Sequence, residues 1–542
     1  MIGERFWSLL GGCLGLLATP LGHAAAGSDE GLAKVLRARL DGDRTGACVQ
    51  AALIEAGSVR RASFCARGER APAADAAFEI GSIAKTMTAL LVADLIEQGR
   101  WSLDDPIARH LPDGTVLPRQ GERQITVRDI VTHSSGLPPL PALMQPARAD
   151  DPYATLTQRQ LLDSLAQVKL ARPIGSQPEY SNFAMMVLSL AVANAHGGDL
   201  EAALRTRVFG PLKMDGAWIA RAPAGQQAAA GHLSTGAPTA PWTIDPALAG
   251  VGMVKARLED MVRYAQGVLQ PQGTPLAAAV RRSLQPLAHG FAMNWMVLRP
   301  GERTLVAHDG GTGGFSATLM IEPAAGRAVV LLADTALTDL GGLGDVAFTL
   351  LGLRDTPTPP RRAVPMPAAL RSGLVGDYEV AGMTMSVRER EGRMIASIPG
   401  QPDFELRADS RGDLYPDNNT ALMTPQLQGG RVESFVWRQG GGAFEGRRAG
   451  AKREFTARNP DWQPWAGVYA LLPGFDLRVF EDNGRLMMQG TGQGAFPVQV
   501  TGNDQVENTA VGVRVQFRRN DKGVVIGLVL MQGGQTLQAD KR

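Results

Sequence analysis

Lysine and cysteine are both scarce in this chain of 542 residues, which has three cysteines and eight lysines. Arginine therefore supplies nearly all of the 55 basic side chains, which face 53 acidic ones. The net charge of +2 argues against nucleic acid or an anionic membrane surface as the main partner. Glycine (64) and proline (35) follow no period, which excludes collagen-like chains.

Common cofactor and hydrolase motifs are also missing. The sequence has no Cys-x-x-Cys, no His-Glu-x-x-His and no Gly-x-x-x-x-Gly-Lys, so nothing in it supports a metal or another cofactor. No serine lies in Gly-x-Ser-x-Gly, which excludes the nucleophile elbow of α/β-hydrolases. Beyond the N-terminus no apolar run reaches about 18 residues, so we expect no stable membrane span in the mature chain.

The first 26 residues have the pattern of an export signal. Arg5 precedes an apolar stretch over Phe6–Leu21, and small residues follow at Ala24–Ala26. We therefore predict a periplasmic or secreted protein. Cys13 loosely resembles a lipoprotein attachment site, but the long apolar stretch after it disfavours this alternative.

The remaining cysteines, Cys48 and Cys65, fall in a predicted β-hairpin whose turn covers Glu55–Ser58. In a hairpin with this turn, two residues face each other when their numbers sum to 113. Cys48 and Cys65 meet this condition, because 48 plus 65 is 113. Directly opposed cysteines can form a disulfide with modest adjustment, and an exported protein meets an oxidising environment. The alternative is a pair of small buried thiols.

Residues 27–355 mix helix and strand patterns. Helices are predicted over Glu30–Leu40, Ser82–Gln98, Val127–Thr132, Gln158–Gln167, Ser181–Ala195 and 339–352. Strands are predicted over the hairpin, Phe78–Gly81, Phe291–Leu298, Leu305–Ala307, Ser316–Ile321 and Arg327–Ala333. Strands at both ends of a helical middle predict an α+β unit whose sheet joins distant segments.

The C-terminal part has a different pattern. Residues 356–367 hold five prolines and predict a stiff, extended linker. After it, Gly376-Asp377-Tyr378 recurs as Gly467-Val468-Tyr469, and Phe435–Gly441 recurs as Leu528–Gly534. Short alternating strands in two related units predict two small antiparallel β-barrels, over 368–458 and 459–542. The Gly-rich segment Gly490–Phe496 is either a loop that reaches a distant site or an ordinary hairpin turn.

Three short motifs point to nucleophilic catalysis. Ser82 and Lys85 lie three residues apart at a predicted helix start, so an amine can reach the hydroxyl, although a plain helix start is the alternative. Tyr180 and Asn182 lie where a loop enters a helix; a phenol near an ammonium loses its proton more easily, so Tyr180 is a second candidate base. The alternative is a core tyrosine beside a helix cap.

The third motif is His308-Asp309-Gly310-Gly311, on a strand-like run. Small residues let a substrate lie against the strand edge, and an exposed backbone N–H there can complete an oxyanion hole. A Gly-rich turn with a solvated histidine is the alternative. We expect His133, in the segment Val131–Pro138, to have a structural role.

Taken in order, Ser-x-x-Lys, Tyr-x-Asn and His-x-Gly resemble the serine hydrolases of the penicillin-recognising superfamily. Gln124–Pro138, Val208–Gly216 and Ala249–Gln266 are similar as well. The resemblance implies a β-lactamase-like fold over residues 27–355. Two barrels after such a unit are most similar to the D-aminopeptidases.

The resemblance also implies residue roles. Ser82 is the nucleophile, while Lys85 and Tyr180 share the acid–base work. Asn182, His308 and Gly310 bind substrate, and the backbone N–H groups of Ser82 and Gly311 form the oxyanion hole. No metal or cofactor is implied.

Many relatives carry lysine where this chain has His308, and this departure bears on the substrate. A histidine with a pKa near 6.5 is mostly neutral at pH 7 and binds a substrate carboxylate poorly. We therefore expect a peptidase or amidase of D-aminopeptidase type that acts on small peptides, amides or esters. An esterase or β-lactamase, or an inactive module that binds cell-wall peptides, remains an alternative, and a homodimer is left open.

Overall fold

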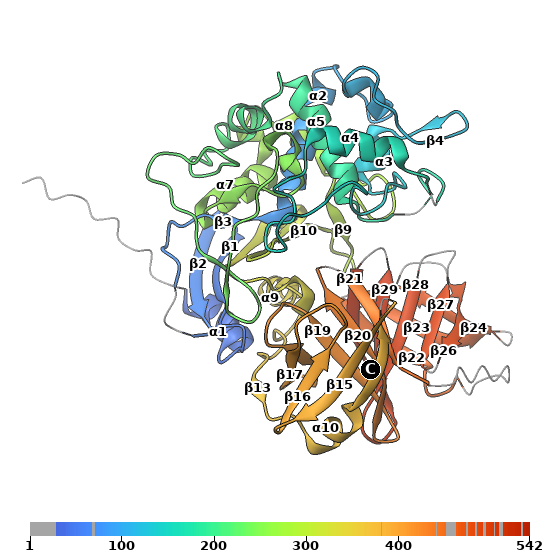
Figure 1. Cartoon of the computed structure of the whole chain (residues 1–542). Coiled ribbons are helices and arrows are strands. Elements are labelled where there is room, and N and C mark those ends of the chain that lie inside the picture. The colour runs from blue at the N-terminus through green and yellow to red at the C-terminus, as the bar shows by residue number, and fades with distance from the viewer. Residues whose placement is uncertain are drawn as a thin grey trace, which may run out of the picture.

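The computed structural model describes residues 29–542 apart from 68–70, 171, 177, 381, 441, 451–461, 473–474, 483–484, 492–494, 503, 509–512 and 533–534. An α+β unit comes first and two antiparallel β-barrels follow it (Figure 1). The predicted signal and Cys13 lie outside the described residues, as do parts of the repeated turns and of the segment Gly490–Phe496.

An antiparallel sheet forms the centre of the α+β unit, in the order β2-β1-β12-β11-β10-β9. Its strands are β1 (Cys48–Glu55), β2 (Ser58–Cys65), β9 (Met296–Leu298), β10 (Leu305–Gly311), β11 (Ser316–Glu322) and β12 (Arg327–Ala333). The predicted joining of distant segments is confirmed, because β1 pairs with β12 along its length. Short strand pairs are β3 (Phe78–Glu79) with β8 (Lys255–Ala256), β4 (Arg119–Gln120) with β5 (Arg123–Gln124), and β6 (Gly231–His232) with β7 (Pro238–Thr239).

The helices agree closely with the predicted segments. The six predicted segments correspond to α1 (Glu30–Leu40), α2 (Ala84–Glu97), α3 (Val127–Val131), α4 (Gln158–Gln167), α5 (Asn182–Ala195) and α9 (Gly344–Leu350). Four further helices were not predicted: α6 (Leu200–Leu204), α7 (Leu258–Leu269), α8 (Ala277–Ser283) and α10 (Ala368–Leu374). Two predictions were too long. The helix over 339–352 is split into a 3-10 turn, η7 (Thr338–Leu340), and α9, because Gly341 and Gly342 adopt positive φ values of 98° and 64°. The strand Phe291–Leu298 shrinks to β9, because Asn294, at φ 58°, makes a turn.

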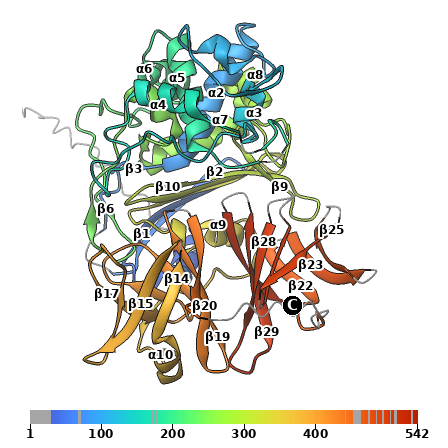
Figure 2. The same cartoon turned by 45° about the vertical axis from the view of Figure 1, so that its right-hand side comes forward.

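The central sheet is covered on both faces (Figure 2). A separate hydrophobic core lies on each face of the sheet, and successive residues of β10 point to opposite cores. Val306 belongs to the core formed with α2, α5 and α7, whereas Leu305 and Ala307 belong to the core formed with α1 and α9. Strand side chains alternate between faces, so a strand buried on both sides has an almost continuous apolar sequence. The helices α2 and α5 lie inside the larger core and are buried nearly all round, so their sequences are apolar on almost every face.

The N-terminal hairpin has the predicted register. Cys48 lies opposite Cys65, and the structure joins them as a disulfide. Ala56 and Gly57 form the turn with φ values of 49° and 80°, the left-handed pair that a tight two-residue hairpin turn requires. The arithmetic of the turn therefore located the disulfide partner correctly.

The first barrel has the strand order β13-β17-β16-β15-β14-β21-β20-β19-β18, and pairing between β17 and β18 closes it. Its strands are β13 (Ala363–Val364), β14 (Gly376–Val380), β15 (Met383–Arg390), β16 (Arg393–Ser397), β17 (Phe404–Asp409), β18 (Leu414–Pro416), β19 (Leu422–Gln428), β20 (Arg431–Gln439) and β21 (Gly442–Arg448).

The second barrel has the order β25-β24-β23-β22-β30-β29-β28-β27-β26. Its strands are β22 (Gly467–Leu472), β23 (Phe475–Asp482), β24 (Arg485–Gly490), β25 (Phe496–Pro497), β26 (Gln499–Gly502), β27 (Gln505–Asn508), β28 (Val513–Arg519), β29 (Val525–Gln532) and β30 (Gln535–Lys541).

The repeat predicted between the barrels extends to individual hydrogen bonds. Buried Tyr378 donates its hydroxyl to the Leu374 carbonyl at 2.7 Å, and buried Tyr469 donates to the Trp465 carbonyl at 2.6 Å. In each barrel the tyrosine pairs in register with a basic residue on the last strand, Arg448 or Lys541. An added Cβ on the first glycine of the motif would meet that basic side chain in both barrels.

The proline-rich linker is bound to both units along part of its length. The Arg361 guanidinium lies 2.8 Å from Asp409 and 2.6 Å from Asp413 of the first barrel. The backbone N–H of Arg361 donates to Asp43, just after α1, at 2.8 Å. Arg44 from the same loop stacks on the Tyr415 ring at 3.6 Å. This buried ionic cluster fixes the first barrel against the α+β unit.

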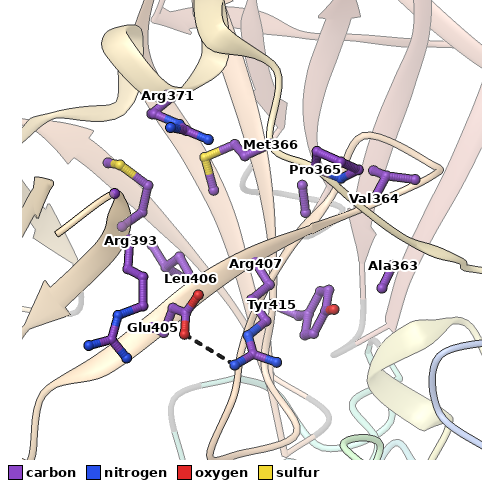
Figure 3. Close-up of a pocket in the computed structure, with 13 residues that line it drawn as sticks. Ala363, Val364, Pro365, Met366, Arg371, Arg393, Glu405, Leu406, Arg407 and Tyr415 are labelled. Atoms are coloured by element: carbon purple, nitrogen blue, oxygen red, sulfur yellow. Dashed lines mark hydrogen bonds and ion pairs between the residues drawn. The ribbon is translucent and has the colours of Figure 1, made fainter. Parts of the chain in front are cut away.

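A cavity of about 320 Å³ lies beneath the linker on the first barrel (Figure 3). Three arginines line it, Arg371, Arg393 and Arg407. Each lies within 4.0 Å of its own glutamate, so the arginines add no net charge. The residues of the three sequence motifs lie elsewhere.

Within the described residues, no single helix combines the length and apolar character needed to cross a bilayer. One pair, Asn182–Ala195 with Leu200–Phe209, meets that test only when both helices are taken together, and the pair is bent by 76°.

The repeated glycine gives a testable prediction. A Cβ on Gly376 would stand 2.0 Å from Arg448 Nη1, and Arg448 also donates to the Tyr378 hydroxyl. We expect Gly376→Ala to lower the free energy of unfolding by about 1–3 kcal/mol, because Arg448 must leave its partners. Urea unfolding checks this, with Gly344→Ala as the control, since nothing lies within 4 Å of that added Cβ. Equal stability of the two variants would contradict the prediction.

Candidate active site

The turn before α2 places Ser82 beside Lys85. Ser82 lies in a 3-10 turn, η1 (Gly81–Ile83), so α2 begins two residues later than predicted. Lys85 Nζ lies 2.7 Å from Ser82 Oγ and donates to the Val251 carbonyl at 2.6 Å. Lys85 is fully buried whereas Ser82 is partly exposed. The nucleophile therefore faces the substrate side, and the amine stays inside the protein.

Burial sets the protonation state of Lys85. Desolvation lowers the pKa of Lys85 well below its ordinary value, since a charged amine is costly in an apolar interior. A neutral amine has a free lone pair and can accept the proton of the Ser82 hydroxyl. The geometry and the lowered pKa together assign Lys85 the chemistry of a general base.

Tyr180 lies on the other side of Lys85. Its ring centre is 4.9 Å from Lys85 Nζ, and its hydroxyl hydrogen-bonds the Ser82 side chain. Burial raises the pKa of Tyr180, and the bond to Ser82 only partly opposes this. The expectation that the nearby lysine would make this phenol easier to deprotonate was therefore wrong, because burial of the phenol itself disfavours its charged form. The raised pKa favours the protonated phenol, so Tyr180 is able to donate a proton in this site.

Asn182 begins α5, two residues after Tyr180. Ser181 caps this helix by accepting from the Ala184 N–H at 2.9 Å, and it donates to the Pro138 carbonyl at 2.6 Å. Asn182 Nδ2 lies 3.5 Å from the Tyr153 hydroxyl. Its Oδ1 is buried and has no hydrogen-bond partner among the described residues. That oxygen is available to accept an N–H from a bound amide.

His308 lies on β10 and is buried. Its Nδ1 lies 2.6 Å from the Asp309 carbonyl, and its Nε2 has no partner among the described residues. Burial and the nearby Lys85 lower the pKa of His308 to about 3. The imidazole is therefore neutral at physiological pH, with Nδ1 as the donor and Nε2 as a free acceptor.

Glycines bring β10 against the Ser82 turn. A Cβ on Gly310 would stand 1.9 Å from the Ile80 carbonyl oxygen, and a Cβ on Gly81 would stand 2.5 Å from the Gly311 nitrogen. Such contacts do not occur between real atoms, so both positions require glycine. The backbone N–H groups of Ser82 and Gly311 come from these two adjoining segments, as an oxyanion hole requires.

Sequence reasoning missed several residues around this site. His133 stacks on Tyr180 with ring centres 4.5 Å apart, and neither ring nitrogen has a partner within the described part of the chain. Tyr153 and Trp242 meet edge-on at 5.3 Å beside Asn182. Gly313 packs against the same pair, since an added Cβ there would stand 2.5 Å from the Trp242 indole nitrogen. Tyr153 and Trp242 come from irregular loops, and no local pattern marks them.

The family assignment follows from the sequence comparison. The family described as Beta-lactamase matches residues 32–353, more than half of the chain. The chain belongs to the beta-lactamase family. The match ends where the two barrels begin, so the family covers the unit that contains Ser82, Tyr180 and His308.

Individual relatives agree with this assignment. The chain is 28% identical over 341 residues to Penicillin-binding protein 4 of Amycolatopsis lactamdurans, covering 57% of this chain and 86% of that protein. It is 26% identical to the D-alanyl-D-alanine-carboxypeptidase/endopeptidase AmpH of Escherichia coli (strain K12), covering 46% and 69%. A solved beta-lactamase/D-alanine carboxypeptidase from Yersinia pestis shares the fold, with a TM-score of 0.51, 21% identity, and coverage of 60% and 95%.

The protonation states predict a specific pH profile. Activity should fall as the pH drops through the lowered pKa of Lys85, because the protonated amine cannot accept the Ser82 proton. His308→Gln should leave this acid limb in place, since a histidine with a pKa of about 3 is already neutral across it. The test is kcat/KM measured between about pH 4 and pH 9 for both proteins. Loss of the limb in His308→Gln would contradict the assignment of Lys85.

Proposed function

We propose that this protein is an exported serine hydrolase that forms an acyl-enzyme on Ser82. Its substrates are short peptides or amides that contain D-residues, as for an enzyme of D-aminopeptidase type. The observation that carries the proposal is the 2.7 Å contact between a fully buried Lys85 amine and a partly exposed Ser82 hydroxyl.

The geometry supports a two-step reaction. Lys85 takes the Ser82 proton as Oγ bonds to the substrate carbonyl carbon, and the negative carbonyl oxygen lies between the N–H groups of Ser82 and Gly311. The carbonyl–nitrogen bond then breaks, and the nitrogen leaves with a proton supplied through Tyr180. Water hydrolyses the ester on Ser82 by the reverse proton path. Asn182 Oδ1 would accept the N–H of the bound acyl portion.

The neutral His308 supports substrates that lack a free terminal carboxylate near β10. A carboxylate placed against a buried, uncharged imidazole would lose its water and gain no compensating cation. Lys85 is a poor substitute, because burial disfavours its charged form as well. Amides with uncharged leaving groups, and peptides bound by their amino end, avoid this penalty.

The alternatives differ in substrate or in class. Relatives include a beta-lactamase of Escherichia coli (strain K12), 30% identical over 202 residues, and an unguisins hydrolase of Aspergillus campestris, 27% identical over 290 residues. None of the relatives named here is a D-aminopeptidase, so β-lactam or ester hydrolysis by the same mechanism is the second candidate. A module that only binds cell-wall peptides has no need for a desolvated amine against a serine hydroxyl.

The proposal includes export from the cytoplasm. The disulfide between Cys48 and Cys65 supports it, because such bonds persist in oxidising compartments. The first 26 residues have the composition of a cleavable signal.

A covalent probe tests the mechanism. Ser82→Ala should abolish turnover and labelling by a fluorophosphonate, because the hydroxyl forms both bonds. Lys85→Met should lower labelling at Ser82 by at least about a hundredfold, since the general base is lost. Gel fluorescence and mass spectrometry of the labelled peptide measure both effects. Labelling that persists in Ser82→Ala would overturn the role of this serine.

A substrate panel tests the specificity. We expect D-alanine p-nitroanilide to be turned over with a higher kcat/KM than nitrocefin, because nitrocefin presents a carboxylate to the neutral His308. His308→Lys should raise the relative kcat/KM for nitrocefin by supplying a cation. A wild-type protein that prefers nitrocefin would favour the β-lactamase alternative.

A further inference from the structure

Gly311 is held from both faces of the central sheet. On the face of the catalytic groups, its nitrogen lies 2.5 Å from where a Cβ on Gly81 would stand. On the opposite face, a Cβ on Gly311 would stand 2.3 Å from Thr338 Oγ1. The N–H that completes the candidate oxyanion hole is therefore fixed between the Ser82 turn and residue Thr338 of η7.

The turn η7 is itself tied to the sheet. The Leu337 N–H donates to Ser316 Oγ at 2.7 Å, and Ser316 pairs in register with Gly311. A shift of η7 would move Thr338 against Gly311 and would strain this bond at the same time. The position of Gly311 thus depends on where η7 lies.

The first barrel contacts η7 directly. The backbone N–H of Gly440, at the hairpin between β20 and β21, donates to Asp339 Oδ2 at 2.9 Å. The positive charge of nearby Arg438 interacts with the same carboxylate. Arg438 is buried and donates to Thr424 Oγ1 at 3.0 Å, so this contact extends into the barrel wall.

The barrel hairpin is held in place by the ionic cluster described above. Thr424 donates to Asp413, and Asp413 lies 2.6 Å from the Arg361 guanidinium of the linker. Arg361 in turn binds Asp43 beside α1. The hairpin therefore reaches η7 from a barrel that is fixed to the α+β unit at a second point.

We infer that the first barrel positions the oxyanion hole, with Asp339 and Thr338 as the positioning residues. The barrel hairpin holds Asp339, Asp339 fixes η7, and Thr338 of η7 presses Gly311 towards Ser82. This inference rests on the proposed function, and it gives the first barrel a role in the rate of acyl transfer. Neither Asp339 nor Thr338 contacts the substrate in this assignment.

Substitution of Asp339 tests the inference in the full-length protein. Removing one oxyanion donor costs about a hundredfold to a thousandfold in kcat, so a misplaced donor should cost less. We expect Asp339→Ala to lower kcat by about tenfold with little change in KM, because the donor acts mainly on the transition state. Asp339→Asn keeps an acceptor for the Gly440 N–H and should retain kcat within about twofold.

A transition-state analogue separates positioning from mere stability. A trifluoromethyl ketone forms a hemiketal oxyanion on Ser82, so its affinity reports on the hole itself. Asp339→Ala and Thr338→Ala should weaken this inhibitor by about the same factor as they lower kcat. Asp403→Ala is the matched control, because Asp403 belongs to the same barrel and binds Arg390 at its surface. It should leave both values unchanged.

The outcomes distinguish this inference from the proposed function. If wild-type protein is labelled at Ser82 and turns over substrate, but Asp339→Ala and Thr338→Ala match it in kcat and inhibitor affinity, the positioning role is wrong. A fall in melting temperature with unchanged inhibitor affinity of the folded fraction also overturns it. If wild-type protein is not labelled at all, the proposed function fails instead.

Discussion

One steric constraint governs the whole arrangement: β10 must lie directly against the turn that carries Ser82. Gly81 and Gly310 make this contact possible, because a Cβ at either position would overlap backbone atoms of the other segment. The contact brings together residues far apart in the sequence, including the nucleophile, His308 and the Gly311 N–H. It also leaves no room for a water layer between them. Nearly every property of the site follows from that exclusion of solvent.

The low polarity around α2 disfavours the charged forms of two basic groups in this site. Burial lowers the pKa values of Lys85 and His308, and Lys85 further lowers the pKa of His308. The same desolvation raises the pKa of Tyr180. These directions favour a protonated phenol beside an uncharged amine, the starting state that the proposed attack by Ser82 needs. The neutral histidine follows from this environment and is consistent with the proposed preference for substrates without a free carboxylate.

Much of this could be predicted from the sequence where the signal is local. The turn at Ala56-Gly57 fixed the hairpin register and so the partner of Cys48, and apolar periodicity located α1, α4 and α5. The spacing of Ser82 and Lys85 predicted that their side chains could meet, and they lie 2.7 Å apart. The direction of the Tyr180 pKa was predicted wrongly, because the sequence does not show that the phenol itself is buried, and burial raises its pKa. Tyr153, Trp242 and Thr338 could not be found, since tertiary packing alone brings their loops to the site.

The buried ionic cluster between the linker and the first barrel sets the orientation of this barrel relative to the α+β unit. Burying Arg361 with Asp409 and Asp413 requires removing all three charges from water, a cost that their mutual attraction only roughly offsets. Apolar contacts of similar volume would hold two domains together as firmly. Arginine, however, presents donors in a fixed planar geometry, so each bond specifies a direction as well as a distance. A barrel that only needed to be attached would not require such precision. A barrel whose hairpin must meet Asp339, behind the strand β10 that carries Gly311, does require it.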